Sequence, residues 1–414
     1  MRETAARLDD PREAAAFASG FQLSAPPPDF VDDPYPYYRA LREHDPVRRL
    51  ADGSLFLTRF DDVSAVYRSP HASSDKKREF RPKFGDTPLY EHHTTSLVFN
   101  DPPLHTRVRR LILGAVNQRA IARMEAGVVA LVDGLLDAMQ DKGAFDLIDD
   151  FAAQIPVEVI GNLLAVPRAD RGPLRGWSLA ILAALEPVPT GQMLDTGNAA
   201  VREFSAYLDG LIADRRAHPL DPDEDVLTRL IQGEVGGERL GHAELVQNCI
   251  FLLNAGHETT TNLIGNGLDT LLSRPDELRR LREDPSLLNT AIEEMLRYES
   301  PLQFNNRCMT ADCEIGGVPV AAGTLVTLCI GAANRDPSQF DDPERFDVGR
   351  KPNRHVAFGH GDHACAGMNV ARMEGRIAIG RLVARFPGLQ RDGAADRDRR
   401  LRFRGLRHLP ARAA

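Results

Sequence analysis

The sequence has few cysteines, few aromatic residues and no long apolar run. Its 414 residues include five cysteines and one tryptophan, and aromatic residues make up 6% of the chain. The cysteines form no CxxC pair, so they indicate a reducing compartment rather than a disulfide framework. No stretch approaches the roughly 18 consecutive apolar residues of a membrane-spanning helix, and residues 1–10 lack a signal-peptide core. These absences predict a cytoplasmic protein that does not enter a membrane.

The charge balance excludes another class of partner. The chain carries 59 acidic and 51 basic residues, a formal charge of −8, which argues against nucleic acid as the main partner. The hydrophobic content of 43% and charged content of 27% are typical of a globular protein. We find no internal repeat and no linker. We therefore expect residues 1–28 to form a partly loose N-terminal extension and residues 29–414 to form one domain.

A glycine-rich loop with one cysteine is the most distinctive segment. Residues 358–367 read Phe-Gly-x-Gly-x-His-x-Cys-x-Gly, and their glycines allow the backbone to approach a flat ligand. Cys365 comes just before a predicted helix at residues 368–379, where unpaired N–H groups favour a thiolate. A thiolate presented in this way can ligate an iron. The alternative is simple packing, because a lone cysteine is usually buried in a core.

The longest predicted helix covers residues 240–273 and is apolar on most sides. Polar residues at 254–260 interrupt it near the middle, which predicts a gap that holds solvent or a ligand. A threonine there can bond the carbonyl four residues back and bend the helix. The dipeptide at 257–258 begins the H-E-x-x-H motif of zinc proteases. Position 261 is Thr261 rather than histidine, so that interpretation is excluded.

Four segments resemble one family in its expected order. The cysteine loop is similar to the haem-binding signature of the cytochromes P-450, the haem-thiolate monooxygenases, although Ala366 stands where leucine is usual. Residues 255–259 resemble their oxygen-binding Ala-Gly-x-(Asp/Glu)-Thr. Residues 101–110, Asp-Pro-Pro-x-His-Thr-Arg-x-Arg-Arg, resemble the segment that binds the haem propionates, and Glu-x-x-Arg at 294–297 resembles a structural pair. A plain basic helix and a surface ion pair are the alternatives for the last two segments alone.

The resemblance, which runs from about Asp33 to Pro410, implies a fold and cofactors. The fold is mainly α, a single-domain cytochrome P-450 fold with a small β-rich region and the haem between the long central helix and the cysteine-loop helix. Residues 29–414 would be this haem domain. The implied cofactors are haem b and O₂. No flavin or ferredoxin segment is recognisable, so we expect a separate ferredoxin or flavodoxin, with a reductase, to supply electrons from NAD(P)H.

The implied reaction inserts one oxygen atom of O₂ into a C–H bond of a small to medium organic molecule, by hydroxylation or oxidative dealkylation. Cys365 would be the iron ligand, and Glu258 and Thr259 would form an acid–alcohol pair that delivers protons. Glu294 and Arg297 would form a buried lock with Arg345. The resemblance assigns further haem contacts to His105, Arg109, Ala255, Gly256, Arg307, Phe358, His363 and Gly367.

The substrate contacts are less defined. Residues 71–100 read as an irregular segment with a basic run, which is either a solvated face or a loop over the pocket. Residues 177–188 are either a mobile lid or a core helix. We expect a monomer, and a basic patch of Arg109, Arg110, Arg372 and Arg376 that steers an acidic ferredoxin. The predicted pocket residues are Phe80, Phe84, Tyr90, Leu182, Leu253, Gln303, Phe304 and Leu406.

Two other functions remain open at this stage. One is a peroxide-driven haem-thiolate enzyme, which the presence of both Glu258 and Thr259 disfavours. The other is a non-catalytic haem sensor or carrier, which would form no product from consumed reducing equivalents.

Overall fold

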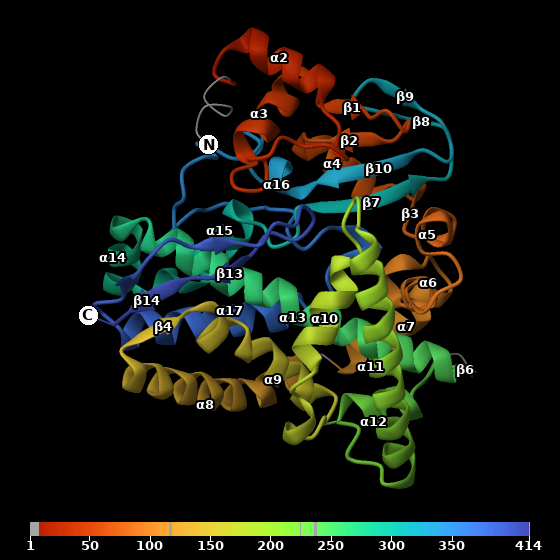
Figure 1. The fold of residues 1–414 in the computed structure, drawn as a ribbon, viewed down its shortest axis with the longest axis vertical. Coiled ribbons are helices and arrows are strands. Elements are labelled where there is room, and N and C mark those ends of the chain that lie inside the picture. The colour runs from red at the N-terminus through yellow and green to blue at the C-terminus, as the bar shows by residue number, and fades with distance from the viewer. Residues whose placement is uncertain (1–7, 116–117, 224, 236–237, 414) are drawn as a thin grey trace. The chain divides into compact units, whose positions relative to one another are not determined.

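The computed structural model describes residues 8–115, 118–223, 225–235 and 238–413. The chain divides into two compact units, each assembled from separated stretches of sequence. Unit 1 comprises residues 1–74, 266–365 and 395–407, and unit 2 comprises the rest. Helices dominate and the sheets are small, so the mainly α prediction is confirmed (Figure 1). No helix in the described part of the chain is both long enough and apolar enough to cross a membrane.

Unit 1 contains the larger sheet, whose strand order is β1-β2-β10-β7-β3. Strand β10 runs parallel to β2 and antiparallel to β7, so Val326 lies between Leu55 and Arg307. The strands are β1 (Val47–Arg49), β2 (Leu55–Leu57), β3 (Ala72–Ser73), β7 (Phe304–Met309), β10 (Leu325–Cys329), the hairpin β8 (Cys313–Ile315) and β9 (Val318–Val320), and the pair β12 (Asp396–Arg397) and β13 (Leu406–His408). The helices are α2 (Pro11–Gly20), α3 (Tyr35–His44), α4 (Phe60–Arg68), α14 (Pro275–Glu283), η4 (Pro285–Leu287), α15 (Leu288–Tyr298), α16 (Ile330–Ala333) and η5 (Gly361–His363).

The N-terminal segment differs from the expected partly loose extension of residues 1–28. Helix α2 begins after Asp10, whose carboxylate accepts hydrogen bonds from the backbone N–H groups of Arg12 at 2.7 Å and Glu13 at 3.4 Å. Its apolar face then packs against α3 in the core, because Ala14, Ala18 and Phe21 are buried. Residues 1–7 lie outside the described part, and the boundary after residue 28 stays a prediction.

Unit 2 is mostly helical. Figure 1 shows α8 and α17 side by side within it. Strand β14 lies between β11 and β4, and β5 pairs with β6. The helices are α5 (Lys77–Phe84), α6 (Pro88–Thr95), η1 (Leu97–Phe99), α7 (Leu104–Ala115), α8 (Gln118–Lys142), the π-helix η2 (Ile148–Ala152), α9 (Gln154–Leu163), η3 (Arg168–Asp170), α10 (Leu174–Ala183), α11 (Gly191–Ala217), α12 (Val226–Gln232) and α17 (Met368–Arg385). The strands are β4 (Ala144–Asp146), β5 (Glu234–Val235), β6 (Glu238–Arg239), β11 (Gln390–Arg391) and β14 (Pro410–Arg412).

Residues 71–100 are not irregular, contrary to the prediction, because they form β3, α5, α6 and η1. Phe80 and Phe84 lie one turn apart on α5 and bury their rings, which contact each other at a centroid distance of 5.1 Å. Gly85, with φ of +62°, ends the helix. The basic run on α5 obscures this amphipathic spacing in the sequence.

Helix α13 (His242–Leu272) confirms the long helix predicted for residues 240–273. Most of its side chains are buried, as its apolar sequence predicts. The division between the two units falls inside this helix, at Gly265 and Asn266. In unit 2, a Cβ added at Gly265 would lie 2.7 Å from the Ile148 side chain, so glycine lets η2 approach the helix closely.

Candidate functional site

The cysteine loop in unit 1 has the tight backbone that its glycines predict. Gly359 and Gly361 have φ of +65° and +71°, in the left-handed region that favours glycine. A Cβ at Gly361 would lie 2.7 Å from the Tyr67 carbonyl oxygen, so no larger residue fits there without a shift. The Cys365 N–H donates to the Phe358 carbonyl at 2.9 Å, and helix α17 starts three residues later at Met368. The predicted cofactor contact Gly367 is its N-cap.

Cys365 also differs from the buried cysteines. Cys249 and Cys329 are completely buried, and desolvation raises the pKa of each thiol to about 12. Both therefore remain protonated near neutral pH, which makes them poor metal ligands. Cys365 is exposed, at the end of the glycine loop. This accessibility fits a ligand better than it fits simple packing.

Two of the residues that we predict to donate hydrogen bonds to the haem carboxylates lie in the same unit as Cys365. Arg307 is buried on β7, with its guanidinium carbon 5.4 Å from the centroid of the Tyr67 ring. It donates from Nη1 to the Asn306 carbonyl at 2.9 Å. His363 is half-buried in η5, within the cysteine loop. Guanidinium and imidazole N–H groups are suitable partners for a haem propionate.

Helix α13 has one accessible stripe within unit 2. Ala255 is exposed although it lies near the middle of the helix, and Gly256 and Thr259 beside it are half-buried. The Thr259 hydroxyl donates to the Ala255 carbonyl at 2.8 Å, which is the bond to the residue four back that the sequence predicts. Glu258 is 2% exposed and lies on an adjacent face. The helix therefore presents small residues and a hydroxyl on an open stripe, next to a buried acid.

Helix α7, which like the middle of α13 belongs to unit 2, carries the other two residues that we predict to donate to the haem propionates. His105 is buried and Arg109 is half-buried, and their spacing of four residues places them on one side of the helix. Arg107, between them, forms an ion pair with Glu244 of α13. The two helices are thus fastened together by a residue that is not a predicted ligand.

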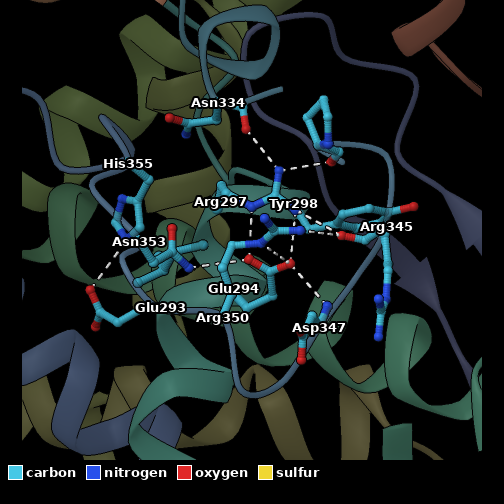
Figure 2. Close-up of polar contacts among 12 residues, drawn as sticks. Glu293, Glu294, Arg297, Tyr298, Asn334, Arg345, Asp347, Arg350, Asn353 and His355 are labelled. Carbon is cyan, nitrogen blue, oxygen red and sulfur yellow. Dashed lines mark hydrogen bonds and ion pairs between the residues drawn. The ribbon is translucent and has the colours of Figure 1, made fainter. Parts of the chain in front are cut away.

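Glu294 and Arg297 in unit 1 are both completely buried, and Figure 2 shows the polar contacts of the cluster around them. Arg297 donates to both carboxylate oxygens of Glu294, at 2.7 and 2.8 Å, as the Glu-x-x-Arg spacing predicts. The prediction that Arg345 is the third member of the cluster is wrong. Its side chain is exposed, and only its backbone carbonyl accepts a bond from Arg297. Arg350 takes the position instead, with its Nε 3.1 Å from Glu294 Oε1. Sequence spacing alone does not distinguish two arginines five positions apart in one loop.

The predicted pocket residues fall into two groups. In unit 1, Leu406 is buried, Gln303 accepts from the Tyr38 hydroxyl at 3.0 Å and donates to the Ser300 carbonyl at 2.7 Å, and Phe304 packs in the aromatic core. The structure gives Gln303 and Phe304 a packing role, contrary to the prediction of substrate contact. In unit 2, the other predicted residues are buried or half-buried, and they are Phe80, Phe84, Tyr90, Leu182 and Leu253.

These observations fit an iron protoporphyrin. Unit 1 offers an accessible thiol in a loop that tolerates a flat ligand, with an arginine and a histidine as donors to carboxylates. Unit 2, taken by itself, offers a further histidine and arginine on α7 and an open stripe of small residues on α13. In the described residues, no cluster of three or more His, Cys, Asp or Glu side chains could hold a metal ion alone. A single thiolate with a porphyrin requires no such cluster.

Comparison with known proteins identifies the family to which the chain is similar. The family model for cytochrome P-450 matches residues 179–399. The chain is 39% identical over 404 residues to cytochrome P-450 107B1 of Saccharopolyspora erythraea, covering 92% of this chain and 96% of that protein. It is 40% identical over 365 residues to the vitamin D(3) 25-hydroxylase of Pseudonocardia autotrophica, covering 87% and 88%.

Solved structures give the same result. P450BioI, crystallised with an acyl carrier protein ligated to hexadec-9Z-enoic acid, superposes with a TM-score of 0.89 at 34% identity, over 93% of this chain and 100% of that chain. CalO2 superposes with the same TM-score at 32% identity, over 96% and 99%. The chain therefore belongs to the cytochrome P-450 family and is a monooxygenase of that family, whose cofactors are haem and O₂.

Proposed function

We propose that this monooxygenase hydroxylates or oxidatively dealkylates a small to medium organic molecule, with electrons from a separate ferredoxin or flavodoxin. The observation that carries the proposal is the accessible stripe of α13, where the Thr259 hydroxyl bonds the carbonyl of exposed Ala255 and the buried Glu258 is the preceding residue in the chain. A sensor or carrier has no need of a buried acid beside such a hydroxyl. The pair is suited to moving protons during oxygen activation.

Each residue then has a defined task. Cys365 would ligate the haem iron, and Phe358 would border the ring. Arg307 and His363 of unit 1 would donate to haem carboxylates, and His105 and Arg109 of α7 are the corresponding donors of unit 2. When bound, the haem supplies the activation of O₂ and the insertion of one oxygen atom into a C–H bond.

Proton delivery falls to the two side chains of α13. Thr259 uses its own hydrogen to bond the Ala255 carbonyl, so its oxygen remains an acceptor for a water molecule. The Glu258 carboxyl can protonate that water and recover its proton from solvent afterwards. The small residues Ala255 and Gly256 leave room for O₂ beside the helix.

The substrate is an apolar molecule with a polar group. Supporting this, the predicted contacts of unit 2 are aromatic or aliphatic, and basic side chains of α5 lie close to them in the sequence. Related proteins are named for a vitamin D(3) hydroxylation and for a complex with an acylated carrier protein. The vitamin in the first name and the hexadec-9Z-enoic acid in the second are extended, mostly apolar molecules, and the same class suits this chain. A screen of such molecules by the spin-state shift of the iron would identify binders.

A basic surface of unit 2 would receive the electron donor. Arg110 on α7 is exposed, and Arg372 and Arg376 on α17 are half-buried, with Arg376 paired to Glu125 at 2.7 Å. These cations, together with Arg109, would steer an acidic ferredoxin that is reduced by NAD(P)H through a reductase. The rate of reduction should fall as ionic strength rises. A rate that is independent of salt contradicts this surface.

The proton-delivery role is tested with Thr259→Ala. We expect this variant to consume NAD(P)H at a similar rate while most of the electrons form hydrogen peroxide instead of product. The measurement is the ratio of product to NAD(P)H oxidised, with Thr261→Ala as the matched control because Thr261 bonds the His257 carbonyl elsewhere on the helix. Full coupling in Thr259→Ala would refute the role.

The ligand role and the two rival functions are tested spectroscopically and by turnover. The reduced protein with carbon monoxide should show the strongly red-shifted Soret band of thiolate ligation, and Cys365→His should lose it, whereas Cys308→Ser should keep it. Retention of the band in Cys365→His excludes Cys365 as the ligand. Turnover that requires peroxide, and not the ferredoxin system, would favour a peroxide-driven enzyme. Absence of product with either system would favour a sensor or carrier.

A further inference from the structure

Helix α13 also has a buried polar stripe, of which the proposed function uses only Glu258. At about 100° per residue, Gln247, Asn254 and Glu258 fall within about 40° of one another around the helix. All three are buried, with exposed fractions of 5%, 3% and 2%. Buried polar side chains are unfavourable unless they are hydrogen-bonded, so a stripe of three requires an explanation.

His92 of α6 bridges the first two residues of this stripe. Its Nδ1 lies 3.0 Å from Gln247 Oε1, and its Nε2 lies 3.4 Å from Asn254 Nδ2. Burial lowers the pKa of His92 to about 4, although the bond to Gln247 opposes this, so the ring is neutral near pH 7. The bond to a carbonyl oxygen places the single ring hydrogen on Nδ1. Nε2 must then be an acceptor.

This arrangement fixes the orientation of the Asn254 amide. Because Nε2 of His92 can only accept, the NH₂ group of Asn254 faces the ring, and Oδ1 is directed away from it. Oδ1 is buried and makes no hydrogen bond within the part of the chain that the structure describes. A buried acceptor without a donor is destabilising. The site is therefore prepared for a donor.

Glu258, the next residue along the stripe, can supply such a donor. Glu258 follows Asn254 by four residues, and side chains at that spacing are neighbours on a helix surface. A protonated carboxyl has one O–H donor, whereas a carboxylate has none. Only the acid form of Glu258 can therefore satisfy the Asn254 oxygen, and the carboxylate would place two acceptors next to each other.

We propose that Asn254, oriented by His92, accepts a hydrogen bond from the protonated Glu258 carboxyl. This bond keeps Glu258 in its neutral, protonated form until it gives up its proton. Asn254 and His92 are positioning residues, since they act through Glu258. The proton leaves Glu258 Oε for the water at Thr259, which leaves a carboxylate that the Asn254 oxygen disfavours. Reprotonation from solvent restores the bond. The role rests on the proposed function of Glu258 as the proton donor.

Other titratable groups lie on the elements around this stripe. His93 follows His92 on α6, with the two rings 4.9 Å apart, and His257 precedes Glu258 on α13. Glu244, near the start of α13, pairs with Arg107 of α7. An effect of Asn254 on Glu258 must be separated from changes at these groups. A signal specific to the Glu258 carboxyl provides that separation.

The test is an infrared pH titration of the haem-loaded protein. The C=O stretch of protonated Glu258 is identified as the band that is absent in Glu258→Gln, and its midpoint is measured in Asn254→Leu. We expect the midpoint to fall by at least one pH unit, a tenfold decrease in the ratio of acid to carboxylate at a given pH. His92→Phe should shift it in the same direction by less, because the amide can then rotate. Retention of the thiolate band with carbon monoxide verifies that each variant is folded.

The matched control is Asn198→Leu. Asn198 of α11 accepts from the Leu89 N–H of α6 at 3.0 Å, so its loss loosens the same helix without changing the Asn254 amide. Its midpoint should equal that of the wild type. An unchanged or raised midpoint in Asn254→Leu would overturn the proposal, as would an equal shift in Asn198→Leu. Coupled turnover in Glu258→Gln decides the proposed function separately: normal coupling there rejects proton donation by Glu258, whatever the titration shows.

Discussion

Two buried glutamates, one in each unit, differ in how their carboxyl groups are bonded. In unit 1, Glu299 is buried against the guanidinium group of Arg404 at 2.6 Å, and Arg335 lies 3.6 Å away. In unit 2, Glu374 of α17 is equally buried, but its Oε2 makes no hydrogen bond within the described residues. Burial would raise the pKa of Glu299, yet the nearby arginines outweigh it and hold that pKa at about 2. Burial alone raises the pKa of Glu374 to about 8.

This difference in bonding corresponds to two roles. Buried acids that are paired with arginines stabilise the fold, and incompletely bonded polar side chains lie in the region of the proposed reaction. The Glu294 and Glu299 clusters satisfy their carboxylates with arginines, and the Arg335 guanidinium also lies between the rings of Tyr35 and Tyr298, at 3.3 and 3.7 Å from their centroids. Such groups remain charged and rigid. Asn254 and Glu374 are incompletely bonded within the described residues. Asn254 lies on α13, which carries the proposed oxygen-binding segment, and Glu374 lies on α17, which follows the cysteine loop. Polar mismatch of this kind is typical of functional regions.

The largest effect is expected from breaking the paired cluster of unit 1. Arg297→Ala leaves Glu294 charged and buried, and it also removes donors to the carbonyls of Asn334, Pro343 and Arg345. Loss of one partner of a buried pair typically destabilises by about 3–5 kcal/mol. Guanidinium chloride unfolding of the haem-loaded protein should show a loss of this size, together with weaker haem retention.

The control for that variant is Arg279→Ala on α14. Arg279 pairs with Asp276 at 3.0 Å, but both side chains are largely exposed, so we expect less than about 1 kcal/mol. Equal losses in the two variants would show that burial does not distinguish these arginines. The comparison between the units would then lose its physical basis.

A smaller effect, of opposite sign, is expected from Glu374→Gln. Because the folded pKa of about 8 lies above the ordinary value of 4.5, the stability contributed by the protonated side chain is complete below pH 4.5 and is lost as pH rises through 8. At about 1.4 kcal/mol per pKa unit, wild type loses on the order of 3 kcal/mol between pH 4.5 and 7. Glutamine does not ionise, so the variant should become more stable than wild type as pH rises.

Glu299→Gln provides the converse measurement. Its depressed folded pKa contributes stability above pH 4.5 that is lost as pH falls toward 2, so the variant should be less stable than wild type at pH 7 and approach it in acid. Thermal midpoints of Glu374→Gln across pH 4–8, and of Glu299→Gln across pH 2–7, test the pair. If the stability of Glu374→Gln has the same pH dependence as that of wild type, then other interactions stabilise both the protonated and the ionised form of Glu374. The buried glutamates of the two units would then not differ in this respect.

The sequence predicted the parts of the site that depend on local patterns. Glycine spacing predicted the cysteine loop, and a long stretch that is apolar on most sides predicted α13. A threonine in the middle of that helix predicted a bond to the carbonyl four residues back, which Thr259 makes to Ala255. It did not predict α5, because lysines, arginines and an internal proline at Pro82 disguise the helix. It also did not reveal the contact of His92 with Asn254, which are 162 positions apart. Contacts of that kind depend on tertiary packing rather than on any local signal.

The smallest expected difference concerns the arginine that sequence reasoning chose incorrectly. Arg350→Ala removes a charge-assisted bond to Glu294 and donors to the backbone carbonyls of Asp341 and Asp342. Hydrogen bonds to charged groups contribute about 1.5–3 kcal/mol, so unfolding should show a loss within that range. Arg345→Ala removes the same formal charge from an exposed side chain, and its loss should stay within about 0.5 kcal/mol. Because both variants change the net charge equally, their difference isolates the buried bond. A larger loss in Arg345→Ala would return the third position of the cluster to Arg345, as the spacing first suggested.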